Sequence, residues 1–411
     1  MIVAAVVFGL TYLVIGLQRL PGLHIGRPAG ALLGATAMVA LGVLDFDAAL
    51  GAIDLDTILF LLGMMIVIAY LQLSGFFEVV ERRVLGFARS ARALLWIVVG
   101  SSGLLSALFM NDTVCLMLTP VVVRVARRLQ LPLAPYLIAL ATAANIGSTA
   151  TIMGNPQNAL IGVRSGISLL EFAGALWPVA VAGLLACGWL IARLYRDSLT
   201  SEPRTVPAPR AAVALQPWVL GASLAAGAGM VAALAWGARP AAAAMAAAAC
   251  VILAGATRPR QALQQVDWGL LLFFGGLFVV MDGVRHAGLT GLLIDPVAGV
   301  LGRSDAAGLG ALALSVTLLS QAVSNVPAVL LFVPFVESVP APAAETPWLG
   351  LAAFSTLAGN LTIIGSVANV IVFETARRDG VEVGFGEYFR VGAPLTAITL
   401  VLALIWLVLA G

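Results

Sequence analysis

The sequence predicts an all-α polytopic membrane protein with about ten transmembrane helices and two re-entrant hairpins. Three observations lead to this prediction. The 411 residues are 61% hydrophobic and only 10% charged, with a mean hydropathy of +1.05, which is far from the composition of soluble domains. Apolar stretches of roughly 20 residues, enough to cross about 30 Å of hydrocarbon, recur along the whole chain. Several residues of the first half recur in the same order in the second half.

The apolar windows place the crossings along the chain. They fall near residues 1–17, 29–45, 57–75, 133–163, 172–192, 217–236, 240–257, 267–285, 347–376 and 388–410. Two further apolar segments, 93–123 and 307–337, are too short for two crossings and a turn, because these need over about 40 residues. We therefore expect each of the two segments to form a re-entrant helical hairpin.

The placement of arginine gives the orientation, since the chain contains no lysine. Arginines flank both ends of the first hairpin, so both ends should face the cytoplasm. Alternation of the spans then leaves on the outside only Arg164, Arg239, Arg285 and Arg303, and it places both termini on the external side of the cell inner membrane. The polar segment 197–216, rich in Pro and Arg, is predicted to be a cytoplasmic linker.

The halves on either side of this linker, 1–196 and 217–411, share residues at matching positions. The matches, at shifts of 211 to 216, are Asp54, Phe60, Gly63 and Gly75 with Asp267, Phe273, Gly276 and Gly288; Asn111 and Pro120 with Asn325 and Pro334; Thr151, Ile152, Gly154 and Asn158 with Thr362, Ile363, Gly365 and Asn369; and Glu171 and Pro178 with Glu387 and Pro394. Matches in one order indicate duplication. Because each half holds five crossings, the second copy should be inverted, as in many secondary transporters.

Four segments are too polar to face lipid: 109–113, 145–158, 323–327 and 360–369. Unwound backbone at membrane depth is tolerated only inside protein or along a wet cavity, so we expect helices broken at mid-membrane around one central site. Pro156 and Pro327 fit helix starts after the breaks, whose amide groups would face the solute. The predicted substrate- and ion-binding residues are Asn111, Asp112, Thr113, Asn145, Thr149, Asn155, Gln157, Asn158, Ser324, Asn325, Asn360, Thr362, Ser366 and Asn369. That such residues merely hold helices together stays open as the alternative.

Asp112 is the ionisable residue among these candidates, and apolar Val326 stands at its matching position. An ionisable group at that depth indicates a function. Asp112 is a candidate to carry a coupling proton or to help bind a cation, and a carboxylate held only by the amides of the hairpin tip is the alternative. No arginine falls at the predicted centre, so the site should suit a neutral or weakly charged hydroxylated solute better than a multivalent anion.

Composition also excludes several functions. Without lysine there is no P-loop, so the chain cannot itself hydrolyse ATP to drive a pump, and neither histidine stands in an HExxH motif. Cys115, Cys187 and Cys250 lie in apolar runs and are expected to be buried, with no disulfide and no metal site. We expect no cofactor and no nucleic-acid partner. A channel and an intramembrane enzyme are kept as alternatives, although no Ser/His pair at membrane depth favours an enzyme.

At these motifs the sequence resembles the ion transporter superfamily of arsenite permeases, sodium/proton antiporters and dicarboxylate carriers. The resemblance spans nearly the full chain, and within the superfamily it is strongest to plant-type silicon efflux transporters and their bacterial relatives. It rests on the runs AIDLDTILFLLGMM, SALFMNDTVCLMLTP, NIGSTATIMGNPQNALIG, SNVPAVLL and AGNLTIIGSVANVIVFETARR.

The resemblance implies a scaffold, a transport part that moves across the membrane, often a homodimer, and proton-driven export of undissociated silicic or arsenous acid. By motif position, Asn111, Asp112 and Thr113 look like the first hairpin-tip signature, and Ser324 and Asn325 look like the second. In dicarboxylate carriers these tips read Ser-Asn-Thr and hold sodium and carboxylate, whereas the first tip here reads Asn-Asp-Thr. Arsenite permeases share the Asn-Asp start but lack the GNPQN run.

The leading prediction is therefore a secondary transporter, not an enzyme, that exports a small neutral oxyacid by proton coupling, with silicic acid ahead of arsenous acid. One alternative is a sodium-coupled carrier of a small anion or dicarboxylate, with a sodium site at the same hairpin tips. The other alternative is a sodium/proton antiporter.

Overall fold

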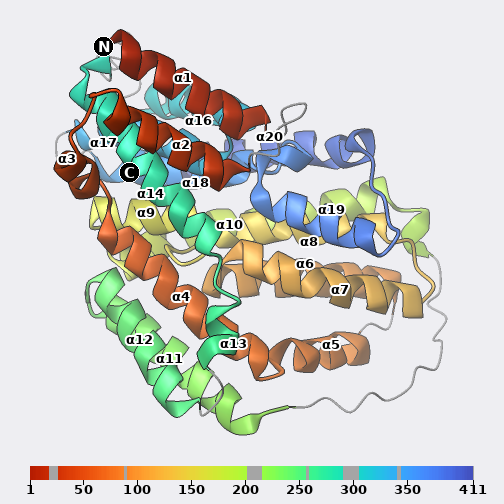
Figure 1. The fold of residues 1–411 in the computed structure, drawn as a ribbon. Coiled ribbons are helices and arrows are strands. Elements are labelled where there is room, and N and C mark those ends of the chain that lie inside the picture. Colours follow the sequence, from red (N-terminus) through yellow and green to blue (C-terminus); the bar gives the residue numbers. More distant parts are fainter. Residues whose placement is uncertain are drawn as a thin grey trace.

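The computed structural model describes residues 1–17, 26–87, 90–200, 215–255, 259–289, 305–339 and 344–410, and the regular structure in these ranges is helical (Figure 1). Most of the predicted linker 197–216, and Arg303 from the orientation argument, lie outside the described residues. Within the described ranges, seven helices are long and apolar enough to cross a membrane. They are α4 (Leu55–Leu73), α6 (Ala91–Leu108), α10 (Leu169–Leu194), α11 (Pro217–Ala235), α14 (Trp268–His286), α16 (Ala306–Val323) and α20 (Phe385–Ala410).

Shorter helices correspond to three of the other predicted spans. The first two spans correspond to α1 (Ile2–Leu17) and α2 (Arg27–Ala40), and the seventh corresponds to α12 (Pro240–Ala254). Short elements that the apolar windows do not reveal are α3 (Phe46–Gly51), α5 (Phe76–Phe87), α13 (Pro259–Leu263) and the 3-10 helix η1 (Ser198–Thr200). These elements connect the spans, and they are too short or too polar to be found by hydropathy.

The segments 133–163 and 347–376 each form two helices separated by irregular backbone. The first contains α8 (Ala134–Ser148) and α9 (Pro156–Ser165), and the second contains α18 (Glu345–Ala358) and α19 (Val367–Arg378) with the 3-10 helix η2 (Ile363–Gly365) between them. Local sequence explains where α9 begins: the side chain of Asn155 accepts a hydrogen bond from the backbone of Asn158, and Pro156 occupies the first turn, where it is tolerated.

Two helical hairpins lie at the expected places, and the first extends beyond its predicted end. One consists of α6 and α7 (Asn111–Arg128), and the other of α16 and α17 (Asn325–Glu337). The arms α6 and α16 have 18 residues each, about 27 Å at 1.5 Å per residue, so either could cross a bilayer alone. The sequence estimate was shorter because α7 continues through Arg124, Arg127 and Arg128, beyond the apolar window.

Helices from the two halves of the chain pack directly on one another. α4 packs on α12 and α2 packs on α14, while α7 lies against α19 and α10 against α20. In Figure 1, α4, α11 and α12 lie side by side at one edge of the molecule, and α6, α7 and α8 run together beside them. The hairpins and interrupted helices therefore form one group, and α1, α2, α4, α11, α12 and α14 form the surrounding one.

Two close helix approaches use matching residues from the two halves. A Cβ at Gly63 of α4 would lie 2.5 Å from the backbone of Ala244 on α12, and a Cβ at Gly276 of α14 would lie 2.7 Å from the backbone of Ala31 on α2. Gly276 follows Gly63, and Ala244 follows Ala31, by the same 213 residues. Small residues let helix backbones approach closely in membranes. The same contact is thus made twice. The first half provides the glycine in one contact and the alanine in the other, and the second half does the reverse.

Burial of the cysteines differs from expectation at one position. Cys115 and Cys187 are buried and free, but Cys250 is exposed. On α12 the buried positions Ala244, Ala247 and Val251 follow helical spacing, and Cys250 lies off that face. An all-apolar helix carries no sequence signal that separates a face toward protein from a face toward lipid, and the prediction for Cys250 was wrong for that reason.

Candidate functional site

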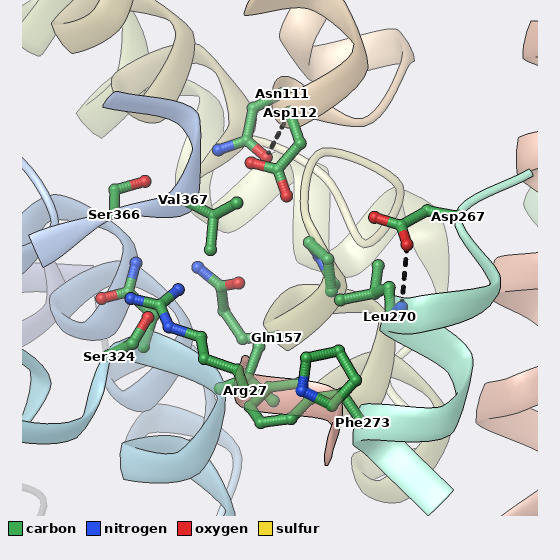
Figure 2. A pocket seen from close by; sticks show the side chains of 14 residues that line it. Arg27, Asn111, Asp112, Gln157, Asp267, Leu270, Phe273, Ser324, Ser366 and Val367 are labelled. Carbon is green, nitrogen blue, oxygen red and sulfur yellow. Dashed lines mark hydrogen bonds between the residues drawn. The ribbon is translucent and has the colours of Figure 1, made fainter. Parts of the chain in front are cut away.

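A cavity of about 190 Å³ lies where the hairpin tips and both interrupted helices meet (Figure 2). Its wall is made largely of the first residues of six described helices. They are Arg27 and Pro28 of α2, Asn111 and Asp112 of α7, Pro156 and Gln157 of α9, Asn325 and Val326 of α17, Val367 of α19 with its N-cap Ser366, and Leu270 of α14 with its N-cap Asp267, together with Ser324 and Phe273. Helix N-termini present free N–H groups and partial positive charge, so the cavity suits an oxygen-rich solute.

The structure divides the predicted site residues into two sets. The residues that line the cavity are Asn111, Asp112, Gln157, Ser324, Asn325 and Ser366. Thr113 lines a smaller adjoining cavity of about 50 Å³, which it shares with Asp112 and Asp267. The residues that do not line either cavity are Asn145, Thr149, Asn155, Asn158, Asn360, Thr362 and Asn369. Most of this last set is fully buried behind the cavity wall, and only Thr362 is partly exposed.

Asn145, on α8, joins the first hairpin to the second interrupted helix. Its Oδ1 accepts hydrogen bonds from Asn111 Nδ2 at 2.9 Å and from Ser366 Oγ at 3.1 Å. Its Nδ2 donates to Oδ1 of Asn360 at 2.9 Å and of Asn369 at 3.0 Å. The amide thereby uses the full hydrogen-bonding capacity of its side chain. Asn145 therefore fixes the positions of groups that line the cavity without lining it itself.

Asn158 and Asn369 close the two helix breaks in the same way. Nδ2 of Asn158 donates to the carbonyls of Ser148 and Thr151, each at 3.1 Å. Nδ2 of Asn369 donates to the carbonyls 211 residues further along, at 2.8 and 3.1 Å. A break frees carbonyls from the helical ladder, and within a membrane they need another donor. In the structure both asparagines therefore cap backbone carbonyls. This observation favours the alternative that these residues hold helices together over direct contact with a solute.

The remaining residues of this buried set also hold backbone or other side chains. Nδ2 of Asn155 donates to Ser148 Oγ at 3.0 Å and to Thr356 Oγ1 at 3.2 Å. Oγ1 of Thr149 donates to the carbonyl of Asn145 at 3.2 Å. Oγ1 of Thr362 donates to Gln321 at 2.8 Å. These contacts tie the interrupted helices to each other and to the second hairpin.

The two hairpin tips differ in backbone conformation. Ser324, at the second tip, has φ 76° and ψ 165°, a region that is essentially restricted to glycine and costs about 1–3 kcal/mol for other residues. Met110, at the first tip, has φ −60°. Each tip is tied to a helix break. The backbone N–H of Asn111 donates to the carbonyl of Gly154 at 2.8 Å. The side-chain nitrogen of Asn325 donates to the carbonyl of Gly365 at 3.1 Å when the amide is turned so that its oxygen and nitrogen both meet suitable partners.

Arg27 lies in the cavity, which contradicts the prediction of a centre without arginine. It is the first residue of α2, and its side chain extends past Gln157 toward Ser324 (Figure 2). Asp112 points into the same space from the facing wall. Asp267 also lines the cavity, and its carboxylate accepts a hydrogen bond from the backbone of Leu270 at 2.9 Å. The prediction failed because Arg27 stands just outside an apolar window, and a long side chain reaches well beyond its own Cα.

The cavity continues toward one side of the molecule. A second cavity of about 380 Å³ shares Arg27, Pro28 and Val367 with the central one and runs along α19 to Glu374 and Arg378. Arg27 therefore lies at the junction of the two cavities, and a solute that moved from one to the other would pass its guanidinium.

At the end of α9, Arg164 ties several elements together. Its Nε lies 2.6 Å from the carboxylate of Asp54 at the start of α4, and a terminal nitrogen lies 3.6 Å from Glu337 at the end of α17. The guanidinium also lies over the ring of Phe278, 5.9 Å from its centroid. Asp54 matches Asp267 in the repeat, but Thr375 stands at the position that matches Arg164.

Sequence reasoning missed further residues that support the site. The hydroxyl of Tyr388 accepts a hydrogen bond from Asn369 at 2.9 Å and donates to the carbonyl of Asn360 at 3.0 Å. Nε2 of Gln321 donates to the carbonyl of Ala358 at 2.9 Å. Gln321 was detectable as a polar residue inside an apolar helix, whereas Tyr388 carries no comparable signal.

Comparison with known proteins gives consistent matches along the chain. A family model described as citrate transporter matches residues 10–358. The chain is 31% identical to the silicon efflux transporter LSI3 of Oryza sativa subsp. japonica, over 97% of this chain and 95% of that protein. It is 32% identical to the uncharacterized transporter Rv2684 of Mycobacterium tuberculosis, over 99% of this chain and 97% of that protein.

One solved structure shows a similar fold. The crystal structure of the Alcanivorax borkumensis YdaH transporter aligns with a TM-score of 0.58 at 16% identity, over 99% of this chain and 96% of that one. At this identity the similarity concerns the fold alone. The all-helical arrangement described above is thus also found in a solved transporter.

Proposed function

Because the chain belongs to the citrate transporter family, within the ion transporter superfamily, we propose that it exports a small oxyacid by proton-coupled secondary transport, with silicic acid as the first substrate to test. The chain is a multi-pass membrane transporter and not an enzyme. The observation that carries the finer proposal is the composition of the central cavity, in which amides and hydroxyls surround one arginine and two carboxylates. The similarity to the silicon efflux transporter of rice supports the choice of silicon.

The charges in the cavity favour a solute that both donates and accepts hydrogen bonds. Arg27 and Gln157 offer N–H donors, while Asp112 and Asp267 offer carboxylate acceptors. The hydroxyl groups of an undissociated oxyacid can bond to both kinds of group. A multivalent anion would meet two carboxylates as well as the single arginine, which makes it the poorer fit. The neutral-solute prediction is therefore kept, because the cavity holds two carboxylates beside its one cation.

Asp112 is the group that we propose carries the coupling proton. Its carboxylate accepts no hydrogen bond from the described residues, and it lines both the central cavity and the small cavity beside Thr113. An ionisable side chain placed on a polar path inside a membrane protein can gain and lose a proton as the cavity changes its exposure.

We further propose that the halves 1–196 and 217–411 are inverted repeats around this cavity. The exchanged contacts of Gly63 and Gly276, and the identical closure of the breaks by Asn158 and Asn369, support this proposal. In that arrangement the cavity along α19 faces the cytoplasm and Arg164 lies on the external side. The hairpins and interrupted helices would then move against the surrounding helices, which in a homodimer would hold the two subunits together.

A carrier of a small anion or dicarboxylate is the second candidate function. It is favoured by Arg27 and by the helix N-termini that face the cavity. Sodium coupling belongs to this candidate, with the ion at the hairpin tips, and a sodium/proton antiporter would need no organic or oxyacid solute at all.

Flux measurements in proteoliposomes test the proposal. Vesicles containing the purified protein are loaded with silicic acid or citrate, and proton and sodium gradients are imposed separately. We expect silicic acid to leave in response to the proton gradient, and Asp112→Asn, which is nearly isosteric, to abolish that response. Asp56→Asn is the matched control, because Asp56 pairs with Arg239 at an exposed position away from the cavity. Flux of citrate alone, or dependence on sodium alone, would contradict the proposal.

A further inference from the structure

We propose that Arg27 binds the solute directly and that Asp112 is its internal counter-charge, which a solute oxygen replaces when Asp112 takes up a proton. The inference rests on the proposed transport function and specifies its ligand. That ligand is an oxyacid that binds either undissociated, with Asp112 ionised, or as a monoanion, with Asp112 protonated.

The base of Arg27 is rigidly placed. A Cβ at Gly30 would lie 2.8 Å from the side chain of Val14, and one at Gly34 would lie 2.2 Å from Thr11 Oγ1, so α2 packs closely against α1. One turn after Arg27, α2 also makes the backbone approach to α14 described above. A long side chain on a fixed helix start loses less freedom when it binds a ligand than one on a loop would. Arg27 thus has the placement of a binding group.

The guanidinium is incompletely satisfied. Nε of Arg27 is buried and has no hydrogen-bond partner among the described residues. A buried donor left without a partner costs about 1–3 kcal/mol, and more if it is charged. Because a guanidinium presents its donors in a planar fork that matches two oxygens at once, an oxyacid in the cavity would satisfy it well. Position adds to this argument, since Arg27 lines both the central cavity and the one along α19.

Among the residues that the structure describes, few charged and titratable groups lie around Asp112. Arg27 of α2 and Asp267 of α14 face it across the cavity, and Cys115 lies one turn further along its own helix, α7. Asp267 is partly occupied as the N-cap of α14. Asp112, by contrast, is free to accept a proton from a ligand. The opposite charges of Arg27 and Asp112 are therefore available to a ligand together.

The two binding forms contain the same atoms and the same number of protons. In one form the solute keeps its O–H and Asp112 is a carboxylate. In the other form the solute O–H bond has broken, an O–H bond has formed on Asp112, and the negative charge has moved to the solute oxygen beside Arg27. No net charge enters or leaves the cavity in this transfer. Arg27 and Asp112 together therefore favour a ligand that brings one monoanion and one proton into the cavity. A solute that cannot supply both is disfavoured.

This arrangement makes a prediction about charge selectivity. Silicic acid and the phosphate monoanion are both tetrahedral oxyacid species of similar size, but near mildly acidic pH only phosphate is charged. Asp112→Asn leaves Asp267 as the one carboxylate of the cavity to repel an anion beside Arg27, so the variant should favour phosphate. Arg27→Gln removes the donor fork and should weaken transport of both probes.

The experiment uses the full-length protein in proteoliposomes, with silicic acid and inorganic phosphate as probes at mildly acidic pH. We expect Arg27→Gln to lower the flux of the transported probe by about 10- to 100-fold, as the loss of hydrogen bonds to a charged group predicts. Arg239→Gln, at an exposed position, should transport the probe at the rate of the wild-type protein. Asp112→Asn should raise the flux of phosphate itself by about 10-fold or more over that of the wild-type protein, because one negative charge is removed from the cavity.

The outcomes separate this inference from the proposed function. If the unchanged protein carries phosphate or citrate but not silicic acid, the choice of substrate fails, and a loss in Arg27→Gln still supports Arg27 as a binding residue. If Arg27→Gln moves the transported probe at the wild-type rate, or if Asp112→Asn does not raise the flux of phosphate itself, the inference is overturned. Should Arg27→Gln fail to fold, Arg27→Lys decides: a raised KM with unchanged kcat supports the inference, and an unchanged KM overturns it.

Discussion

Replacing Asn145 by alanine should destabilise the protein far more than the loss of one hydrogen bond would. The amide of Asn145 bonds to Asn111 on the first hairpin and to Ser366, Asn360 and Asn369 around the second helix break. All five side chains are buried. Asn145→Ala removes the common partner at once, so the remaining polar groups lose a donor or an acceptor in a place with little access to water.

The bonds described above give the magnitude. Four side-chain bonds at an average of about 0.6 kcal/mol in a membrane amount to about 2.4 kcal/mol. Any partner left without a new bond adds about 1–3 kcal/mol, so we expect a total loss of about 2–5 kcal/mol. Thr119→Val is the matched control, since buried Thr119 makes one bond, to the carbonyl of Cys115 at 2.6 Å.

Denaturant titration in detergent micelles, followed by tryptophan fluorescence, measures both free energies of unfolding. Asn145→Ala should lose several times as much stability as Thr119→Val. Equal losses in the two variants would refute the idea that Asn145 links the first hairpin to the second helix break, because the shared bonds would then contribute no more than a single helical one.

Three further predictions concern backbone strain, helix packing and ion pairing. Ser324→Gly should raise the free energy of unfolding by about 1 kcal/mol, since glycine tolerates a positive φ, and a loss of stability in the same titration would contradict the strain. Gly147→Ala should lower it by about 1–3 kcal/mol, because the new Cβ would lie 2.1 Å from the carbonyl oxygen of Gly103, whereas Gly100→Ala, in open space, should change little. Arg164→Gln should speed hydrogen exchange in the last turns of α9 and α17, and unchanged exchange there would show that the ion pairs do not hold these ends.

Much of the fold could be predicted because its signals are local. A run of apolar residues has to cross lipid, and a cluster such as Asn155, Pro156 and Asn158 starts a helix by its own side-chain chemistry. The two helix breaks were detectable for the same reason. The Asn-rich runs are incompatible with lipid contact wherever the rest of the chain lies.

Within the site, the sequence could identify polar residues but not their direction. An asparagine that caps carbonyls at a break and one that lines a cavity have the same side-chain amide, so Asn158 and Asn111 look alike in sequence. Arg27 could not be placed because it enters the cavity from a helix far away in sequence. Tyr388 meets Asn369 through tertiary packing alone.

The ion pair of Arg164 and Asp54 would make the two faces of the proposed carrier chemically unequal. In the proposed inverted arrangement, opening the cavity on the side where α9 ends would separate these charges, whereas Thr375 stands at the position that matches Arg164 and Asp267 forms no ion pair among the described residues. Dissolved salt weakens attraction between partly exposed charges. A high salt concentration on that side alone would therefore speed the conformational step that breaks the ion pair, and it would leave the rate of the opposite step unchanged. The solute would approach its final concentration ratio faster, but the ratio itself would not change, because the gradient of the coupling ion sets it.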